Sequence, residues 1–266
     1  MPLLDRGGVG IHYEIHGPLQ GAGGGTVADA GTKKPALLLT HGYSATAEMW
    51  TGNLTALAGE RKVITWDIRG HGRSDSPTDP DLYSESISVD DIAAILDATG
   101  DATALIGGLS LGGYLSLAFY LRYPERVEAL ILCDTGPGYR RDEPREDWNA
   151  MARRTADELE RSGLETVGRS AEVRIGSHRS AAGLALAARH ILTQHDSRVI
   201  DSLPDVKVPT LVLVGAEDKP FLGAAEVMAA KIPHATLVVL SGAGHAANLD
   251  RPDAFDAAVL EFLATF

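Results

Sequence analysis

The residues that most constrain the fold of this chain are 104–113, Ala-Leu-Ile-Gly-Gly-Leu-Ser-Leu-Gly-Gly. The apolar run at 102–106 predicts a buried parallel strand, and the weakly polar run at 111–123 predicts a helix. A strand that passes into a helix over so few residues needs a sharp turn. Glycines permit such a turn, because a Cβ at those positions would collide with neighbouring backbone. The sequence therefore predicts a strand, a tight turn and a helix, with one serine in the turn.

The serine in this turn, Ser110, lies within the pattern G-x-S-x-G, which runs from Gly108 to Gly112. In such an elbow the serine backbone is strained and the hydroxyl is exposed at the end of the strand. The N–H of the next residue, Leu111, begins the helix and points toward an oxyanion that develops on a substrate. A glycine-rich turn with an incidental serine would match the same pattern, so the rest of the chain has to decide whether Ser110 is a nucleophile.

Length and composition limit the classes of protein to which the chain can belong. Its 266 residues suffice for one large α/β domain or for a core with an inserted subdomain. The net charge of −12 argues against nucleic acid and anionic membrane surfaces as partners. The single cysteine, Cys133, lies in an apolar run, and the N-terminus shows no secretory leader. We expect a cytoplasmic protein with no membrane partner, and nothing in the sequence indicates its oligomeric state.

Strand and helix patterns alternate along most of the chain, which predicts a mostly parallel sheet covered by helices on both faces. Strands are predicted at 9–16, 35–40, 62–66, 102–106, 127–133, 210–215 and 235–240. Between 136 and 205 the strand patterns stop, and helical patterns appear at 148–160, 164–173, 181–192 and 197–203. We interpret 136–205 as a helical cap, and 1–135 together with 206–266 as the core.

Residues 18–34 are rich in Gly, Ala and Thr and have no periodicity, which predicts a flexible connection. The connection precedes a strand, so we expect it at the end of the sheet opposite to the chemistry. His12 and His16, on the strand before it, would project from one face about 13 Å apart, too far to share a metal ion. We expect both histidines at the surface, and we expect no metal or cofactor in this protein.

Three predicted strand ends carry, in chain order, Ser110, Asp218 and His245. A serine hydroxyl is a poor nucleophile at pH 7 and needs a histidine to take its proton. That histidine needs a carboxylate that fixes its tautomer and stabilises the imidazolium. The order nucleophile, acid, histidine is the one expected when later loops complete a serine elbow. Asp134 also ends a strand and is the alternative acid, although a turn residue at this point needs no catalytic role.

Five segments of the chain resemble the α/β-hydrolase family in its compact, cap-bearing form. They are His41-Gly42, the run Asp-Ile-Arg-Gly-His-Gly-Arg-Ser at 67–74, the glycine-serine turn at 108–113, Val-Gly-Ala-Glu-Asp at 214–218, and Gly-Ala-Gly-His at 242–245. The resemblance spans nearly the whole chain, and only the 18–34 connection and the cap show no family pattern. It implies an α/β fold with a mostly parallel eight-stranded sheet, helices on both faces and a helical cap inserted after the sixth strand.

The same resemblance implies a role for each motif residue. Ser110 would be the nucleophile, Asp218 the acid and His245 the base. The residue after the His-Gly pair, Tyr43, would donate the second backbone N–H of an oxyanion hole beside that of Leu111. The histidine of that pair would pack against the loop and orient it rather than take part in the chemistry.

A serine at the elbow excludes the relatives that use an aspartate there to open epoxides or displace halide. The leading hypothesis is hydrolysis of a carboxylic ester or lactone of small size through an acyl-serine intermediate, and the motifs also resemble those of enol-lactone hydrolases of aromatic catabolism. Alternatives are hydrolysis of a carbon–carbon bond in a ring-cleavage product and cofactor-free formation of peracids. A non-catalytic ligand-binding protein would have little use for all three groups of the triad.

The predicted cap is rich in arginine. Between residues 140 and 200 there are 11 Arg, no Lys and 10 acidic residues, so this part carries about +1 and the rest of the chain about −13. Arginine binds carboxylates with two parallel hydrogen bonds, which makes an anionic substrate one interpretation. Arg140 and Arg141, near the start of the cap, are the candidates for binding it, and Trp148 is a further candidate contact. The alternative is that these arginines are solvated and pair with acidic neighbours.

Overall fold

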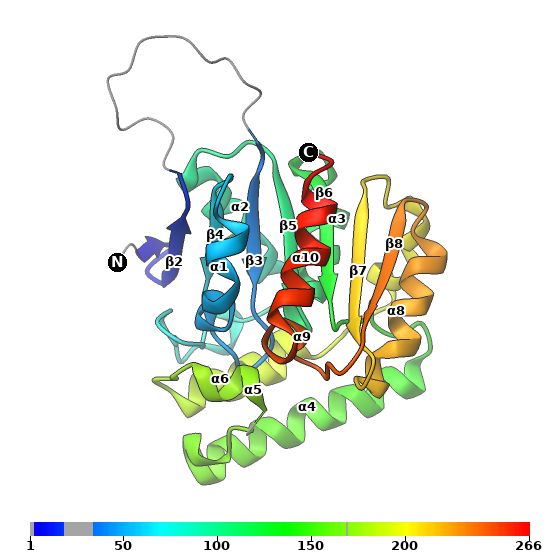
Figure 1. Cartoon of the computed structure of the whole chain (residues 1–266). Coiled ribbons are helices and arrows are strands. Elements are labelled where there is room, and N and C mark those ends of the chain that lie inside the picture. The colour runs from blue at the N-terminus through cyan, green and yellow to red at the C-terminus, as the bar shows by residue number, and fades with distance from the viewer. Residues whose placement is uncertain (1–2, 19–33, 169) are drawn as a thin grey trace, which may run out of the picture.

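The computed structural model describes residues 3–18, 34–168 and 170–266 (Figure 1). Of the connection predicted at 18–34, residues 19–33 lie outside the described residues, so its predicted flexibility stays a prediction. None of the described helices has the length and hydrophobicity needed to cross a membrane.

Within the described residues, eight strands form one sheet: β1 (Leu3–Asp5), β2 (Gly10–His16), β3 (Ala36–Thr40), β4 (Val63–Trp66), β5 (Ala104–Leu109), β6 (Val127–Cys133), β7 (Thr210–Gly215) and β8 (Ala235–Leu240). Their spatial order is β1-β2-β4-β3-β5-β6-β7-β8. β2 runs antiparallel to β1 and β4, and all other pairs are parallel. The mostly parallel eight-stranded sheet is confirmed, and the short β1 is a strand that the sequence pattern did not predict.

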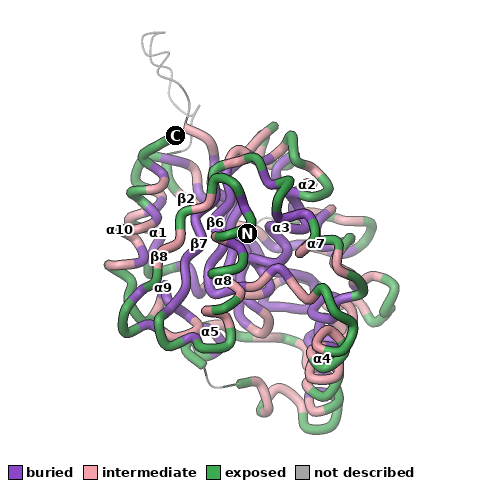
Figure 2. Tube along the Cα trace, turned by 90° about the vertical axis from the view of Figure 1, so that its right-hand side faces the viewer, coloured by how far each residue is buried: buried purple, intermediate pink, exposed green. Residues whose placement is uncertain are grey.

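Helices cover both faces of the sheet, and because successive strand residues point to opposite faces, each strand contributes to two apolar clusters. On β5, Leu105 packs in one apolar cluster with Trp50 and Phe255, and Ile106 packs in the other with Leu115. The first cluster lies under α1 (Thr51–Leu57) and α10 (Pro252–Leu263); the second lies under α2 (Glu85–Thr99), α3 (Leu111–Arg122) and α8 (Lys219–Lys231). Figure 2 shows the buried residues gathered along the strands, between the helices.

The segment between β6 and β7 is helical, and its described residues form no strand. Its helices are α4 (Asp142–Ser162), α5 (Ala171–Ile175), α6 (Ala181–Ala187) and α7 (Arg198–Asp201), with short turns of helix at Gly163–Thr166, Ala188–Leu192 and Leu203–Asp205. The helix predicted at 148–160 begins earlier, at Asp142. The helix predicted at 164–173 is instead a 3₁₀ turn followed by the short α5. Figure 1 shows α4, α5 and α6 beyond the carboxyl ends of the strands, and we use the name cap for residues 136–205.

The prediction that His12 and His16 lie at the surface is wrong for His12. His12 is 2% exposed, and its Nδ1 lies 3.4 Å from Oδ2 of the buried Asp67. His16 is partly buried, with Nε2 3.1 Å from Thr65 Oγ1. This polar residue of β2 is buried because the turn that follows β4 folds over it, with Ser74 and Asp67 of that turn against His12. Among the described residues there is no group of three or more His, Cys, Asp or Glu side chains placed to hold a metal ion.

Candidate active site

The elbow predicted at residues 108–112 is present, and it is a turn of one residue. β5 ends at Leu109 and α3 begins at Leu111, so Ser110 alone makes the turn, with φ 55° and ψ −115°. A positive φ is strained for a residue that carries a Cβ. A Cβ on Gly108 would lie 2.6 Å from the carbonyl oxygen of Thr40, and one on Gly112 would lie 2.2 Å from the same atom. Both positions therefore require glycine because neighbouring backbone approaches so closely.

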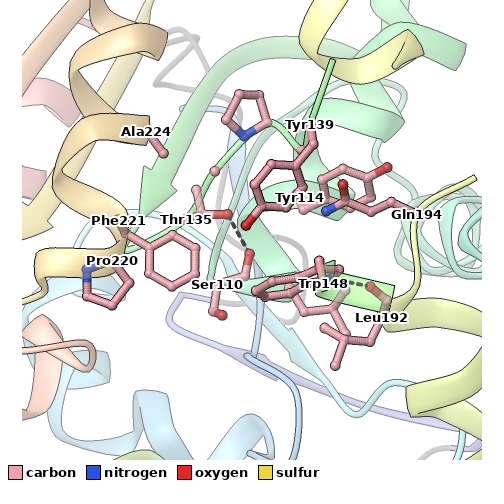
Figure 3. Close-up of a pocket in the computed structure, with 14 residues that line it drawn as sticks. Ser110, Tyr114, Thr135, Tyr139, Trp148, Leu192, Gln194, Pro220, Phe221 and Ala224 are labelled. Carbon is pink, nitrogen blue, oxygen red and sulfur yellow. Dashed lines mark hydrogen bonds between the residues drawn. The ribbon is translucent and has the colours of Figure 1, made fainter. Parts of the chain in front are cut away.

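Hydrogen bonds from three sides hold the Ser110 backbone in this conformation. Its N–H donates to the carbonyl oxygen of Cys133 (2.9 Å), and its own carbonyl oxygen accepts from the N–H of Tyr114 (3.1 Å). The same carbonyl oxygen accepts from the Thr135 hydroxyl (2.6 Å), as the dashed line in Figure 3 marks. The Ser110 hydroxyl makes no hydrogen bond to any described residue. The backbone is thus held firmly while the hydroxyl is left available for chemistry.

The His-Gly loop passes directly beside the elbow. A Cβ built on Gly42 would lie 3.4 Å from the Cβ of Ser110. His41 is buried, its Nδ1 donates to the carbonyl oxygen of Gly42 (2.7 Å), and its Nε2 accepts from the N–H of Ile68 (3.0 Å). Burial lowers the pKa of His41 to about 4, so the ring is neutral and orients the loop, as the family resemblance implied. The next residue, Tyr43, is tied to the cap through its hydroxyl, which donates to the carbonyl oxygen of Leu184 (3.0 Å).

Asp218 and His245 meet at the carboxyl ends of β7 and β8. The Oδ2 of Asp218 lies 2.8 Å from Nδ1 of His245, and Asp218 is 4% exposed. The imidazole also stacks on the ring of Phe221, with the ring centres 4.9 Å apart. Burial lowers the pKa of His245, but the hydrogen bond and charge of Asp218, together with the charges of Asp134 and Glu172, outweigh burial and raise the pKa above its ordinary value. The carboxylate of Asp218 therefore orients His245, the histidine that the order of motifs along the chain indicated.

Asp134, the alternative acid, lies close by but does not contact the imidazole. It is fully buried, its Oδ1 accepts from the N–H of Gly215 (2.8 Å), and its Oδ2 accepts from the N–H of Ala247 (3.2 Å). Burial raises the pKa of Asp134 to about 7. Asp134 therefore connects the loop that leads to Asp218 with the segment that follows His245. The structure brings Asp218, and not Asp134, into hydrogen-bond contact with the histidine.

A cavity of about 230 Å³ opens beside Ser110 (Figure 3). Its lining comes from the elbow, the turn after β6, the cap and the start of α8, and includes Tyr114, Tyr139, Trp148, Leu192, Gln194 and Phe221. Ligand cavities in proteins usually hold a few hundred cubic ångströms and are mostly apolar, so this is a small site of the ordinary kind. Trp148, which the sequence suggested as a substrate contact, lines it, and its Nε1 donates to the carbonyl oxygen of Leu192 (2.9 Å).

The structure does not bring Arg140 and Arg141 to this cavity. Arg140 is 62% exposed and its Nε lies 2.6 Å from Oδ1 of Asp201 on the molecular surface. Arg141 is exposed just before α4. No Lys, Arg, Asp or Glu is among the described residues that line the cavity. Arg140 is thus exposed and pairs with an acidic residue, although with Asp201 rather than with its acidic neighbours in sequence.

Sequence reasoning missed several side chains that shape the site. Phe221 lies three residues after Asp218, so one turn of α8 places it against His245, a spacing that could have been noticed. Thr135 directly follows the rejected acid candidate Asp134, and no motif marks it. Gln194 belongs to the cap, and its approach to the cavity depends on tertiary packing that no local pattern encodes.

The amino-acid sequence matches the model of the Alpha/beta hydrolase family over residues 37–258. It is 28% identical to a "Putative 2-succinyl-6-hydroxy-2,4-cyclohexadiene-1-carboxylate synthase" of Bacillus subtilis (strain 168), over 90% of this chain and 94% of that protein. It is 27% identical to "3-oxoadipate enol-lactonase 2" of Acinetobacter baylyi, over 88% of this chain and 90% of that one. The solved structure of a thermophilic esterase from Thermogutta terrifontis superposes with a TM-score of 0.80 at 28% identity, covering 99% of this chain and 96% of the esterase. With its sheet order and its serine elbow, this chain belongs to the alpha/beta hydrolase family and is an enzyme.

Proposed function

We propose that this enzyme hydrolyses a carboxylic ester or lactone with a small, uncharged acyl group through an acyl-Ser110 intermediate. The observation that carries the proposal is the 2.8 Å contact between Asp218 Oδ2 and His245 Nδ1, at the same end of the sheet as the strained Ser110 turn. A hydroxyl with no hydrogen-bond partner among the described residues, a histidine oriented by a buried carboxylate and an adjacent small cavity form the set of groups that acyl transfer needs.

The first half of the reaction is acylation. Asp218 holds the proton on Nδ1 of His245, which leaves Nε2 to take the proton of the Ser110 hydroxyl. The Oγ of Ser110 attacks the substrate carbonyl carbon, and the carbonyl oxygen becomes an oxyanion. The backbone N–H groups of Leu111 and Tyr43 would donate to that oxyanion, each contributing about 3 kcal/mol of transition-state stabilisation. The imidazolium then gives its proton to the leaving oxygen as the carbon–oxygen bond breaks.

The second half is deacylation. A water molecule gives its proton to Nε2 of His245 and attacks the acyl carbon, and the imidazolium returns the proton to Ser110 Oγ as the acid departs. The side chain of His245 is 32% exposed, which supports an approach of water to this side of the site. With a lactone the alcohol and the acid leave as one hydroxy acid. The enol-lactonase name of one relative favours including lactones in the proposal.

The same residues could also cleave a carbon–carbon bond or form a peracid, and the cavity favours neither alternative. Ring-cleavage products carry carboxylates, and the described lining of the cavity offers no cation to hold one. A peracid requires the enzyme to accept peroxide in place of water, for which no group in the lining is specialised. An uncharged ester or lactone is the substrate class that agrees with the lining.

The test combines active-site labelling with a substrate panel on the purified protein. We expect a fluorophosphonate probe to label the wild type and Ser86→Ala, a control at a serine outside the cavity, but not Ser110→Ala. We expect turnover of short p-nitrophenyl esters or simple lactones, and little turnover of carboxylated dienoates. Labelling that persists in Ser110→Ala, or a preference for the dienoates, would overturn the proposal.

A further inference from the structure

The side chain of Gln194 reaches the cavity without a hydrogen-bond partner. Gln194 is 8% exposed, and it lines the cavity beside Ser110. Its Oε1 is buried and has no partner, and neither polar atom of its amide makes a hydrogen bond to any described residue. Buried side-chain amides are normally satisfied, and Nε2 of this one is not fully covered as Oε1 is, so Nε2 points to a hydrogen bond that it donates to a ligand in the cavity.

The surroundings of Gln194 hold it in this position. Its backbone N–H donates to Oδ1 of Asn149 on α4, and its carbonyl oxygen accepts from Nδ2 of the same side chain, both at 2.8 Å. The side chain extends over Gly138, which has φ 87°. A Cβ on Gly138 would lie 2.8 Å from Gln194 Oε1 and 3.4 Å from the Tyr114 ring, so the glycine makes room for the amide. The hydrogen bonds that fix the Gln194 backbone and the space beside Gly138 indicate that the amide has a defined position in the cavity.

Most other polar side chains of the lining already have partners. The Tyr114 hydroxyl donates to Oε2 of Glu85 (2.8 Å), Nε1 of Trp148 donates to the carbonyl oxygen of Leu192, and the Thr135 hydroxyl donates to the Ser110 backbone. Besides Ser110 and the half-buried Tyr139, this leaves the amide of Gln194 to bind a ligand. Figure 3 shows that amide among the aromatic side chains of the lining.

We propose that Gln194 is a specificity residue of the acyl pocket, and that the preferred acyl group carries an uncharged carbonyl oxygen, of a ketone or an amide, along its chain. The Oε1 is covered next to Gly138, so the Nε2 of the amide is the atom left to donate to that oxygen. A carboxylate is a poor match because none of the described residues that line the cavity is cationic. The inference rests on the proposed function, since the acyl pocket is defined by acylation of Ser110.

The test uses p-nitrophenyl esters in matched pairs, so that the leaving group is constant and only the acyl pocket is examined. Each pair compares a keto acid with the alkene of the same shape, in which C=CH₂ replaces C=O: 4-oxopentanoate with 4-methylenepentanoate, 5-oxohexanoate with 5-methylenehexanoate, and 6-oxoheptanoate with 6-methyleneheptanoate. We expect the wild type to prefer the ketone of at least one length by about tenfold in kcat/KM, the effect of one neutral hydrogen bond.

Two variants of Gln194 separate hydrogen bonding from shape. Gln194→Leu removes the amide, and Gln194→Glu keeps nearly the same shape while its carboxylate cannot donate to a ketone at neutral pH. Both should bring the ketone-to-alkene ratio to about one, while the exposed neighbouring variant His195→Ala should keep the wild-type ratio. Because the ratio is taken within one protein sample, a general loss of activity or stability does not change its interpretation.

The outcomes distinguish the inference from the proposed function. Equal kcat/KM values within every pair in the wild type, or a ketone preference that survives both Gln194 variants, would overturn the inference and leave the esterase proposal intact. A wild type that hydrolyses no member of any pair and is not labelled by fluorophosphonate would overturn both.

Discussion

Arginine side chains serve different purposes in the core turn at 67–75 and in the cap. In the turn, Arg69 is 4% exposed and binds Asp91 with two parallel contacts, Nε to Oδ2 at 2.5 Å and Nη2 to Oδ1 at 2.9 Å. In the cap, Arg189 is 26% exposed and contacts Asp157 and Glu160, which are about half exposed. A buried pair depends on both partners, because removal of one leaves an uncompensated charge, whereas an exposed pair contributes little.

Other polar side chains of the core turn at 67–75 also have specific hydrogen-bond partners. The carboxylate of Asp67 accepts from the N–H of Ala47 (2.7 Å) and of Arg73 (2.9 Å). The hydroxyl of Ser74 donates to the carbonyl oxygen of Asp67 (2.5 Å) and accepts from the N–H of His12 (2.9 Å). Such directional bonds allow one residue type at each position. The ion pairs of the cap, such as those of Arg189, are exposed and place fewer constraints on residue type, so we expect substrate specificity to depend on the cap.

The largest effect is expected in the core, at the elbow. Ser110→Ala should lower kcat/KM for a short p-nitrophenyl ester by at least about 10⁴-fold, because loss of the nucleophile removes the reaction path. The hydroxyl has no partner among the described residues, so the thermal midpoint should change little. Near-native turnover in this variant would show that Ser110 is not the nucleophile.

The next effect distinguishes the two buried carboxylates. Asp218→Asn should reduce kcat by about 10⁴-fold, because the amide favours the wrong tautomer of His245. Asp134→Asn should act on stability, by about 1–3 kcal/mol, because its amide group would face one of two backbone N–H donors, those of Gly215 and Ala247. Measured kcat and urea unfolding on both variants decide between them, and equal kinetic losses would give Asp134 a catalytic role.

The sequence predicted the core part of the site because its residues occupy the ends of neighbouring parallel strands. Ser110, Asp218 and His245 each follow a strand and lie in short motifs, so chain order and sheet topology are enough to place them. Gln194 and Phe221 could not be selected in this way, because their contacts depend on how the cap and α8 pack against the elbow. The burial of His12 was missed for the same reason, since a turn distant in sequence covers it.

The stabilities of two variants test directly whether the buried Arg69 matters more to the fold than the exposed Arg189. Arg69→Gln should destabilise the fold by about 3 kcal/mol, because the fully buried Asp91 would lose its two-contact partner and keep only the single contact from the partly exposed Arg6. Arg189→Gln should change the free energy of unfolding by about 1 kcal/mol or less, since its partners are half exposed. Urea unfolding of both variants at one pH provides the test. Equal losses would mean that the exposed network of the cap carries more stability than its exposure suggests.

A smaller effect concerns the pH dependence of the core site. His245 must be neutral to accept the serine proton, and its pKa is raised above the ordinary value because Asp218, with smaller contributions from Asp134 and Glu172, outweighs burial. We therefore expect kcat/KM to fall as the pH drops through that raised pKa, so the acidic limb lies at a higher pH than an unperturbed histidine would give. In Asp218→Asn burial still lowers the pKa while the main raising contribution is gone, so the limb of the residual activity should move to lower pH. A limb that stays in place would assign the titration to another group.

The smallest effect is expected from the arginines that the sequence offered as substrate ligands. The double variant Arg140→Gln and Arg141→Gln should leave kcat/KM within about twofold of the wild type for both p-nitrophenyl pentanoate and the p-nitrophenyl monoester of glutarate, which adds a carboxylate. Neither arginine lines the cavity, and the pair of Arg140 with Asp201 is about half exposed, so solvent and salt screen its field over about 8 Å at physiological ionic strength. A KM that rises selectively for the glutarate ester would show that the charge of the cap reaches the substrate. It would also place an anionic acyl group in a cavity whose described lining holds no cation, which would contradict the proposal that the cap selects uncharged acyl groups by shape and by the amide of Gln194.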